Sequence, residues 1–271
     1  MVKYIIVSHH HFDHIGGLWK LYDEIKKSNP NVRIISSLIT MKTFNNFENE
    51  SHFIRSKKTW GILTGKFKKI DEDAFRIIKP NEYINAEETN FKIIDTFNLN
   101  NTKVDLAILK TPGHASGHIS SLFIKDRNAD FLFFGEAAGG LAHSKNLKTI
   151  ANSVAPDFNY KDYMQSLEKI QKLSPLNGGY AHFGLVAGKE NVTEIIAEHE
   201  SMMKEFRQKV IEYYSEKPET KYVFDKLTVF FGSKERIEGS IDENLPEYQT
   251  FIKFFVSMLY GMMMDLGYRK D

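Results

Sequence analysis

Cysteine is absent from all 271 residues of this chain, so the chain forms no disulfide bond and offers no thiolate to a metal ion. Small secreted domains commonly depend on a disulfide framework, and that class of protein is therefore excluded. Any transition metal would have to be bound by histidine and carboxylate side chains.

A large net charge and a long apolar segment are lacking as well. Lys and Arg number 36 against 35 Asp and Glu, which disfavours broad electrostatic binding to nucleic acid or anionic membrane. The apolar run between Lys253 and Asp265 would span about 16 Å as a helix, short of a ~30 Å hydrocarbon core. The first residues lack the pattern of a signal peptide. We therefore expect a cytoplasmic protein that acts on a small molecule, with neither nucleic acid nor membrane as a partner.

The apolar patterning at the start of the chain predicts a βαβ unit. Lys3–Ser8 is apolar on both faces and predicts an interior strand, and Val32–Ile35 predicts the next strand. The residues after Gly17 follow the spacing of an amphipathic helix. A histidine cluster thus lies at the turn between the first strand and its helix.

Further elements are expected along the rest of the chain, although residues 40–75 show no clear period. Strands are predicted over Ile77–Ile78, Phe91–Ile94, Val104–Leu109, Phe131–Phe134 and Asn177–Ala181. Helices are predicted over Tyr160–Leu173, over Val192–Tyr214 and in most of the tail, where Leu227–Phe231 is strand-like. We divide the chain into a domain of residues 1–215 and a mainly helical extension of residues 216–271.

Potential metal ligands follow directly after four of the predicted strands. They are His9, His11, His114, Glu136 and His182. Strands that run the same way end at one edge of a sheet, so these side chains are expected to converge. His9 and His11 are two residues apart and point the same way on an extended chain, which suits chelation of one cation. Asp13 and His14 follow on the turn, within reach of a second cation.

The run His9-x-His11-x-Asp13-His14-x-Gly16-Gly17 resembles the signature of the metallo-β-lactamase superfamily. Thr111-Pro112-Gly113-His114, Phe134-Gly135-Glu136 and Ala181-His182-Phe183-Gly184 resemble its later motifs, in the family's order. The resemblance covers residues 1 to 215 and is closest to general hydrolases related to glyoxalase II. It implies an α/β fold, the αββα metallo-β-lactamase sandwich, with a binuclear metal site at one edge of the sheets.

The resemblance also implies roles for individual residues. Two divalent ions would be bound, either zinc or alternatively iron or manganese. The first would be held by His9, His11 and His114, and the second by Asp13, His14 and His182. Glu136 would bridge the two ions. The implied nucleophile is a hydroxide that bridges the metals. Asp13 would orient it or take its proton, which makes Asp13 the candidate catalytic residue.

Two departures from the family pattern stand out. Glu136 occupies the bridging position where the family usually has aspartate, and its extra methylene is expected to widen the metal spacing or weaken the second site. Only eight residues precede His9, where the family carries its first strands. We therefore expect the sandwich to lack its first N-terminal strands. One explanation is that Met1 is not the true start of the protein. The alternative is that a dimer partner or the segment Phe44–Phe67 occupies the place of the missing strands.

The other histidines and the last apolar stripe have plainer interpretations. His10 is expected to be structural or solvated, and His52 and His199 to lie on the surface. His118 and His143 would contact a ligand or the substrate, or else lie on the surface. The stripe that follows helical spacing near the C-terminus is expected to be core, a homodimer contact or a cover for the pocket; it comprises Phe251, Phe254, Phe255, Met258, Leu259, Met262 and Leu266.

These features favour hydrolysis of an ester-like bond, a thioester or a related acyl bond, by a metal-bound hydroxide. An iron-dependent redox enzyme that resembles persulfide dioxygenases is the first alternative. A phosphodiesterase or nuclease and an inactive metal-binding protein are the others.

Overall fold

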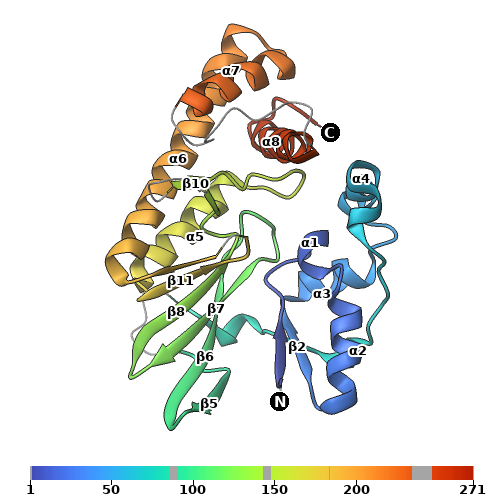
Figure 1. Cartoon of the computed structure of the whole chain (residues 1–271), viewed down its shortest axis with the longest axis vertical. Coiled ribbons are helices and arrows are strands. Elements are labelled where there is room, and N and C mark those ends of the chain that lie inside the picture. Colours follow the sequence, from blue (N-terminus) through green and yellow to red (C-terminus); the bar gives the residue numbers. More distant parts are fainter. Residues whose placement is uncertain (1, 86–90, 143–147, 183, 234–245, 271) are drawn as a thin grey trace.

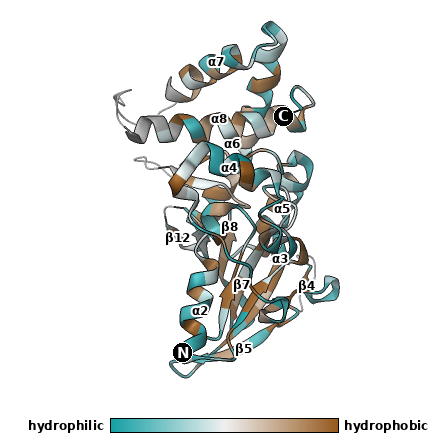
Figure 2. Cartoon of the chain, turned by 90° about the vertical axis from the view of Figure 1, so that its right-hand side faces the viewer, coloured by the Kyte–Doolittle hydropathy of each residue, from teal (hydrophilic) through white to brown (hydrophobic). Residues whose placement is uncertain are grey.

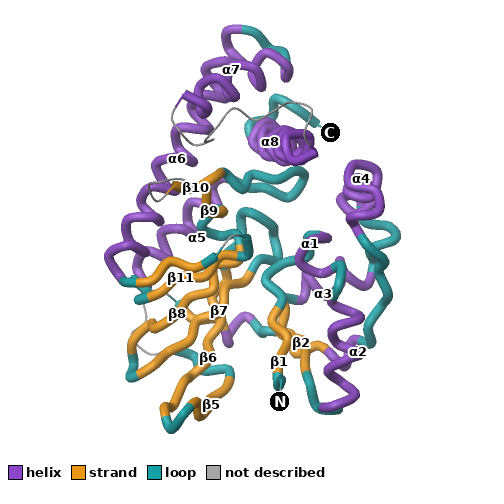
Figure 3. Tube along the Cα trace, viewed as in Figure 1, coloured by secondary structure: helices purple, strands orange, loops and turns teal. Residues whose placement is uncertain are grey.

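The computed structural model describes residues 2–85, 91–142, 148–182, 184–233 and 246–270 of the chain. Within them, two β-sheets lie face to face between two layers of helices (Figure 1, Figure 3). Helices α2 (Leu18–Ser28) and α3 (Leu38–Asn45) cover one sheet. Helices α5 (Tyr160–Leu173) and α6 (Lys189–Glu216) cover the other. This arrangement confirms the predicted αββα sandwich.

The smaller sheet is formed by the first part of the chain. Its parallel strands, in the order β1-β2-β3, are β1 (Tyr4–Ile6), β2 (Arg33–Ser36) and β3 (Phe75–Ile77). The connections contain the short helix α1 (Phe12–Ile15), helix α4 (Ser51–Trp60) and 3-10 turns at Gly61–Thr64 and Glu72–Ala74. The ambiguous residues 40–75 are thus largely helical.

The larger sheet has seven strands in the order β12-β11-β8-β7-β6-β4, with β5 also paired to β6. They are β4 (Tyr83–Ile84), β5 (Asp95–Leu99), β6 (Thr102–Lys110), β7 (Ile119–Lys125), β8 (Asn128–Gly135), β11 (Asn177–Tyr180) and β12 (Leu185–Ala187). A separate hairpin pairs β9 (Gly140–Ala142) with β10 (Lys148–Ile150), and a further 3-10 turn, Pro80–Glu82, precedes β4. Strands β6, β8 and β11 run in one direction, so their ends meet at the same edge.

The alternation of side chains along β6 shows how the core is divided. Leu106 and Ile108 pack between the sheets against Ile35. Ala107 and Leu109 point the opposite way, into the core beneath α5 and α6. Successive residues of a strand face opposite sides of its sheet, and here both sides are covered. The central strands accordingly are mostly brown in Figure 2, whereas much of the outer surface of the helices is teal.

The last helices form a third core. Helices α7 (Thr220–Ser233) and α8 (Pro246–Asp265) pack with α5 and α6 around Phe206, Leu227 and Met262. No helix of the described part of the chain is both long enough and apolar enough to cross a membrane. The predicted helical C-terminal extension is confirmed, while the division after residue 215 stays a prediction.

Three local predictions are wrong. Leu227–Phe231 is helical, because Leu227 and Phe231 lie four residues apart on the face of α7 that enters the core. Phe91–Ile94 precedes β5 and is not itself a strand. Lys3–Ser8 is not an interior strand: β1 is half-buried and, among the described strands, pairs only with β2.

Candidate metal centre

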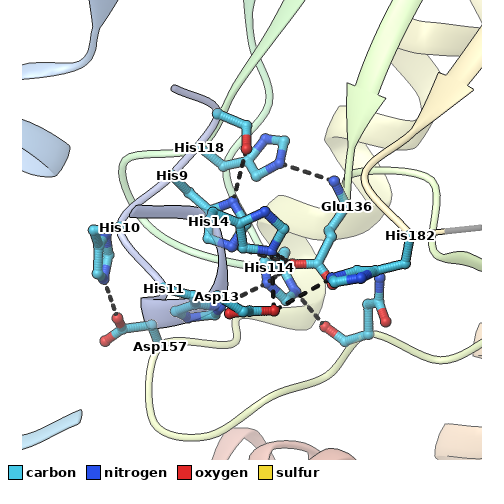
Figure 4. Close-up of polar contacts among 12 residues, drawn as sticks. His9, His10, His11, Asp13, His14, His114, His118, Glu136, Asp157 and His182 are labelled. Atoms are coloured by element: carbon cyan, nitrogen blue, oxygen red, sulfur yellow. Dashed lines mark hydrogen bonds and ion pairs between the residues drawn. The ribbon is translucent and has the colours of Figure 1, made fainter. Parts of the chain in front are cut away.

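All seven candidate ligands lie at one edge of the sandwich, just beyond the ends of four strands. After β1 the chain passes through His9 and His11 into α1, which carries Asp13 and His14. The other three follow β6, β8 and β11; they are His114, Glu136 and His182. The shared direction of these three strands brings their following residues together, and Figure 4 shows the seven side chains turned toward a common centre.

Four of these residues form a buried cluster that is suited to a first cation. Ligand atoms of His9, His11, His114 and Glu136 all lie within 4.8 Å of one another. His114 Nε2 is 2.9 Å from His11 Nδ1 and 2.8 Å from Glu136 Oε2. Three imidazoles and a carboxylate match the ligand types that zinc takes in proteins.

A second cluster adjoins the first. Ligand atoms of Asp13, His14 and His182 also lie within 4.8 Å of one another. Asp13 Oδ2 is 3.3 Å from His182 Nε2 and 3.4 Å from His14 Nε2. Glu136 contacts both clusters, because its Oε2 is 3.1 Å from His9 Nε2 and 3.0 Å from His14 Nε2. One carboxylate oxygen of Glu136 therefore lies close to a histidine of each cluster.

Three ring nitrogens at the centre show that these residues fit metal ions. Nε2 of His9, His11 and His14 is buried and has no hydrogen-bond partner. Oε2 of Glu136 lies 3.1 Å from Nε2 of His9 and 3.0 Å from Nε2 of His14. Burial, with neighbouring imidazoles as a smaller cause, lowers the pKa of His9 and His11 well below the ordinary value, so both rings are neutral. Neutral imidazole is the form that binds a metal.

The charge of Glu136 is balanced by its neighbours. Burial alone would raise the pKa of this carboxyl, but His114, His14 and His9 together lower it well below its ordinary value. Burial likewise lowers the pKa of His114 and His14, but Glu136 outweighs that effect and the net pKa of each is raised. An ionised carboxylate in this position is suited to compensating two adjacent cations.

Residues behind the ligands fix their orientation. His114 Nδ1 lies 2.7 Å from the backbone carbonyl of Asn152, so Nε2 faces the centre. His118 is fully buried, its Nε2 accepts a hydrogen bond from the backbone N–H of Glu136 at 3.1 Å, and burial lowers its pKa to about 3. Gly135 adopts a φ of +62°, and a Cβ there would lie 2.6 Å from His118 Nε2. Only glycine therefore allows Glu136 to approach in this way.

The remaining described histidines are more buried than we expected from the sequence. His118, His52 and His199 are buried, so the surface interpretation is wrong for all three. His10 is buried as well, and its Nε2 lies 2.8 Å from Asp157 Oδ2, turned away from the centre in Figure 4. His143 lies outside the described residues.

A cavity of about 970 Å³ opens onto the metal centre. Asp13, Glu136 and His182 line it on one side. Its other walls come from α4, α6, α7 and α8 and from the loop after β10. Helix α8 thus covers the pocket, one of the roles expected for the C-terminal stripe, whereas the contribution of α4 had no signal in the sequence.

The comparisons agree with this geometry. A family model described as the metallo-beta-lactamase superfamily matches residues 1–176. A metallo-beta-lactamase fold-containing protein of Sulfurisphaera tokodaii is 30% identical over 202 residues, which is 73% of this chain and 68% of that protein. The chain therefore belongs to the metallo-beta-lactamase superfamily.

Solved structures show the same fold. An archaeal superfamily protein from Sulfolobus tokodaii has a TM-score of 0.56 at 24% identity, over 96% of this chain and 79% of its own. A beta-lactamase domain protein from Burkholderia ambifaria has a TM-score of 0.57 at 14% identity, over 97% and 68%. The sec-alkyl sulfatase PisA1 has a TM-score of 0.55 at 13% identity, and this chain matches only 41% of its length.

Proposed function

We propose that this chain is a metal-dependent hydrolase of ester-like bonds, and specifically of a thioester or a related acyl bond. The observation that carries the proposal is the pair of ligand clusters that share Glu136 at the floor of a cavity. His9, His11 and His114 would hold one ion, and a further three residues the second; these are Asp13, His14 and His182.

When bound, two divalent cations supply Lewis acidity toward a carbonyl oxygen and make water a nucleophile near neutral pH. The chain's own part is to fix the ligands and to manage a proton. The side chain of Asp13 lines the cavity, and its carboxylate lies 3.3 Å from His182 Nε2. Asp13 would orient the attacking water or accept its proton, while burial of His9 and His11 keeps bulk water from their ring nitrogens.

Particular observations weigh against the alternatives. A mononuclear iron site would not need the second cluster of Asp13, His14 and His182. A nuclease would be expected to present an extended basic surface, but this chain has a net charge of +1 and a cavity covered by α8. An inactive binding protein gives no reason for Asp13 to face the cavity beside two imidazoles.

The test is a panel assay with the full chain. Protein stripped by a chelator and reloaded with Zn²⁺, Mn²⁺ or Fe²⁺ is offered thioesters, lactones and phosphodiesters while oxygen uptake is recorded. We expect thioester or lactone cleavage that is lost on chelation and restored by metal, without oxygen uptake. Oxygen consumption with a persulfide, or no hydrolysis by protein carrying two ions per chain, would contradict the proposal.

A further inference from the structure

We propose that the cavity selects an amphiphilic substrate, whose acyl chain lies among the apolar side chains between α6 and α8 and whose anionic part lies beside α4. The inference rests on the proposed function and names the substrate class of the same site. It follows from the different chemistry of the two ends of the cavity and from the position of the metal centre between them.

The end of the cavity toward α6 is apolar. The side chains that line it come from α6, α7 and α8; they are Met202, Phe206, Phe231, Phe255 and Met258. All five belong to one buried cluster, in which the Phe206 ring lies 5.7 Å from that of Phe231 and 6.3 Å from that of Phe255. Unbranched methionines adapt to the shape of a flexible chain. This end therefore suits an aliphatic or aryl group.

The end toward α4 is basic. Arg55 and Lys58 of α4 and Lys253 of α8 line it, and all three are exposed. None of the three forms an ion pair with any described residue. Among the described residues, the only carboxylates that line the cavity are Asp13 and Glu136, at the metal centre. Like charges that share a cavity wall favour an anionic partner.

Helix α8 lines both ends of the cavity and covers it. Near its middle, the Phe254 ring lies 4.8 Å from the ring of Trp60 in α4, and Lys253 donates to the backbone carbonyl of Thr59. One residue further on, Phe255 turns toward Phe206 of α6. Figure 1 shows α8 between α6 and α4, above α1, the helix that carries Asp13 and His14. A substrate whose scissile bond lies at the metal centre would therefore have its apolar chain on one side of that bond and its anionic group on the other.

Binding of unreactive probes separates this inference from the proposed function. Decane-1-sulfonate, its four-carbon homologue and 1-decanol are titrated calorimetrically into the full chain, both as purified and after metal removal. We expect the ten-carbon sulfonate to bind at least tenfold more tightly than either of the others. The preference for decane-1-sulfonate should persist without metal, because arginine and lysine side chains, rather than a metal ion, attract the sulfonate.

Matched variants of α4 identify the end that binds the anion. The double variant R55Q/K58Q should weaken decane-1-sulfonate about tenfold and leave 1-decanol unchanged. K57Q is the control, since Lys57 is exposed on the same helix but does not line the cavity. Equal binding of sulfonate and alcohol, no effect of chain length, or an equal loss in K57Q would overturn the inference. Selective binding without thioester or lactone hydrolysis would instead contradict only the proposed function.

Discussion

The hydroxyl of Tyr163 donates a hydrogen bond to the backbone carbonyl of Glu136 at 3.2 Å, which ties α5 to the backbone of the residue whose carboxylate contacts both ligand clusters. The same hydroxyl lies 2.7 Å from Nε2 of the buried His199. Burial raises the pKa of Tyr163 well above its ordinary value, so the hydroxyl stays a donor. His199 Nδ1 continues the chain of contacts to Thr149 at 2.9 Å.

Removal of this hydroxyl should destabilise the fold. Tyr163→Phe removes the hydrogen bonds of this hydroxyl to two buried groups, the Glu136 carbonyl and His199 Nε2, which costs about 1–3 kcal/mol in the free energy of unfolding. Urea denaturation measures the change. Tyr160→Phe is the matched control, because Tyr160 lies on the same helix and is only half-buried. An equal effect of the two substitutions would show that the contact to Glu136 has no special weight.

Loss of one ligand should empty the first metal site. The full chain should bind up to two divalent ions, and His114→Ala should retain at most one and lose hydrolytic activity, because affinity depends on ligand number and geometry. Elemental analysis after reconstitution gives the stoichiometry. His52→Gln should keep both ions, since His52 is buried but belongs to neither cluster. No bound metal in the unsubstituted chain at neutral pH would refute the assignment.

Neutralisation of Glu136 should weaken the second ion more than the first. The amide of Glu136→Gln compensates two cations poorly, whereas His9, His11 and His114 remain for the first ion. Glu136→Asp keeps the charge and should keep two ions. Stepwise metal titration distinguishes the two affinities, and an unchanged stoichiometry and turnover in Glu136→Gln would show that Glu136 is no ligand.

Two adjacent phenylalanines of α8 should respond differently to substitution. Phe255 is 7% exposed and packs on Phe206, so Phe255→Ser should cost about 3 kcal/mol or more. Phe254 is 40% exposed at the cavity mouth, so Phe254→Ser should change stability by less than about 1 kcal/mol. Urea denaturation and solution mass report the results. Dissociation of a dimer in both variants would instead support the predicted homodimer contact.

The sequence predicted the fold best where one segment determines its own structure. Tyr160–Leu173 is amphipathic, and Asn159 caps it by accepting a hydrogen bond from the N–H of Asp162, so its bounds follow from local pattern. Convergence of the seven candidate ligands followed from parallel strand ends. Burial of His199 did not, because its partners Tyr163 and Thr149 lie 36 and 50 residues away in the chain.

The cavity could not be predicted from local sequence patterns for the same reason, because residues far apart in the chain line it. Arg55 and Lys58 belong to a segment without clear period, and only the folded chain sets them opposite α8. The carboxylate of Glu136 was predicted from its position after β8, but its contacts to His9 and His14 depend on how the two sheets meet. Such relationships require the tertiary structure.

The contact between Lys253 and Thr59 joins residues 194 positions apart. All seven candidate ligands lie between His9 and His182, whereas the roof over them is helix α8, Pro246–Asp265. During synthesis on the ribosome, the ligands therefore emerge well before the segment that encloses them. The nascent chain has its candidate ligands while the cavity is still open on one side, and the cavity is completed only when α8 docks.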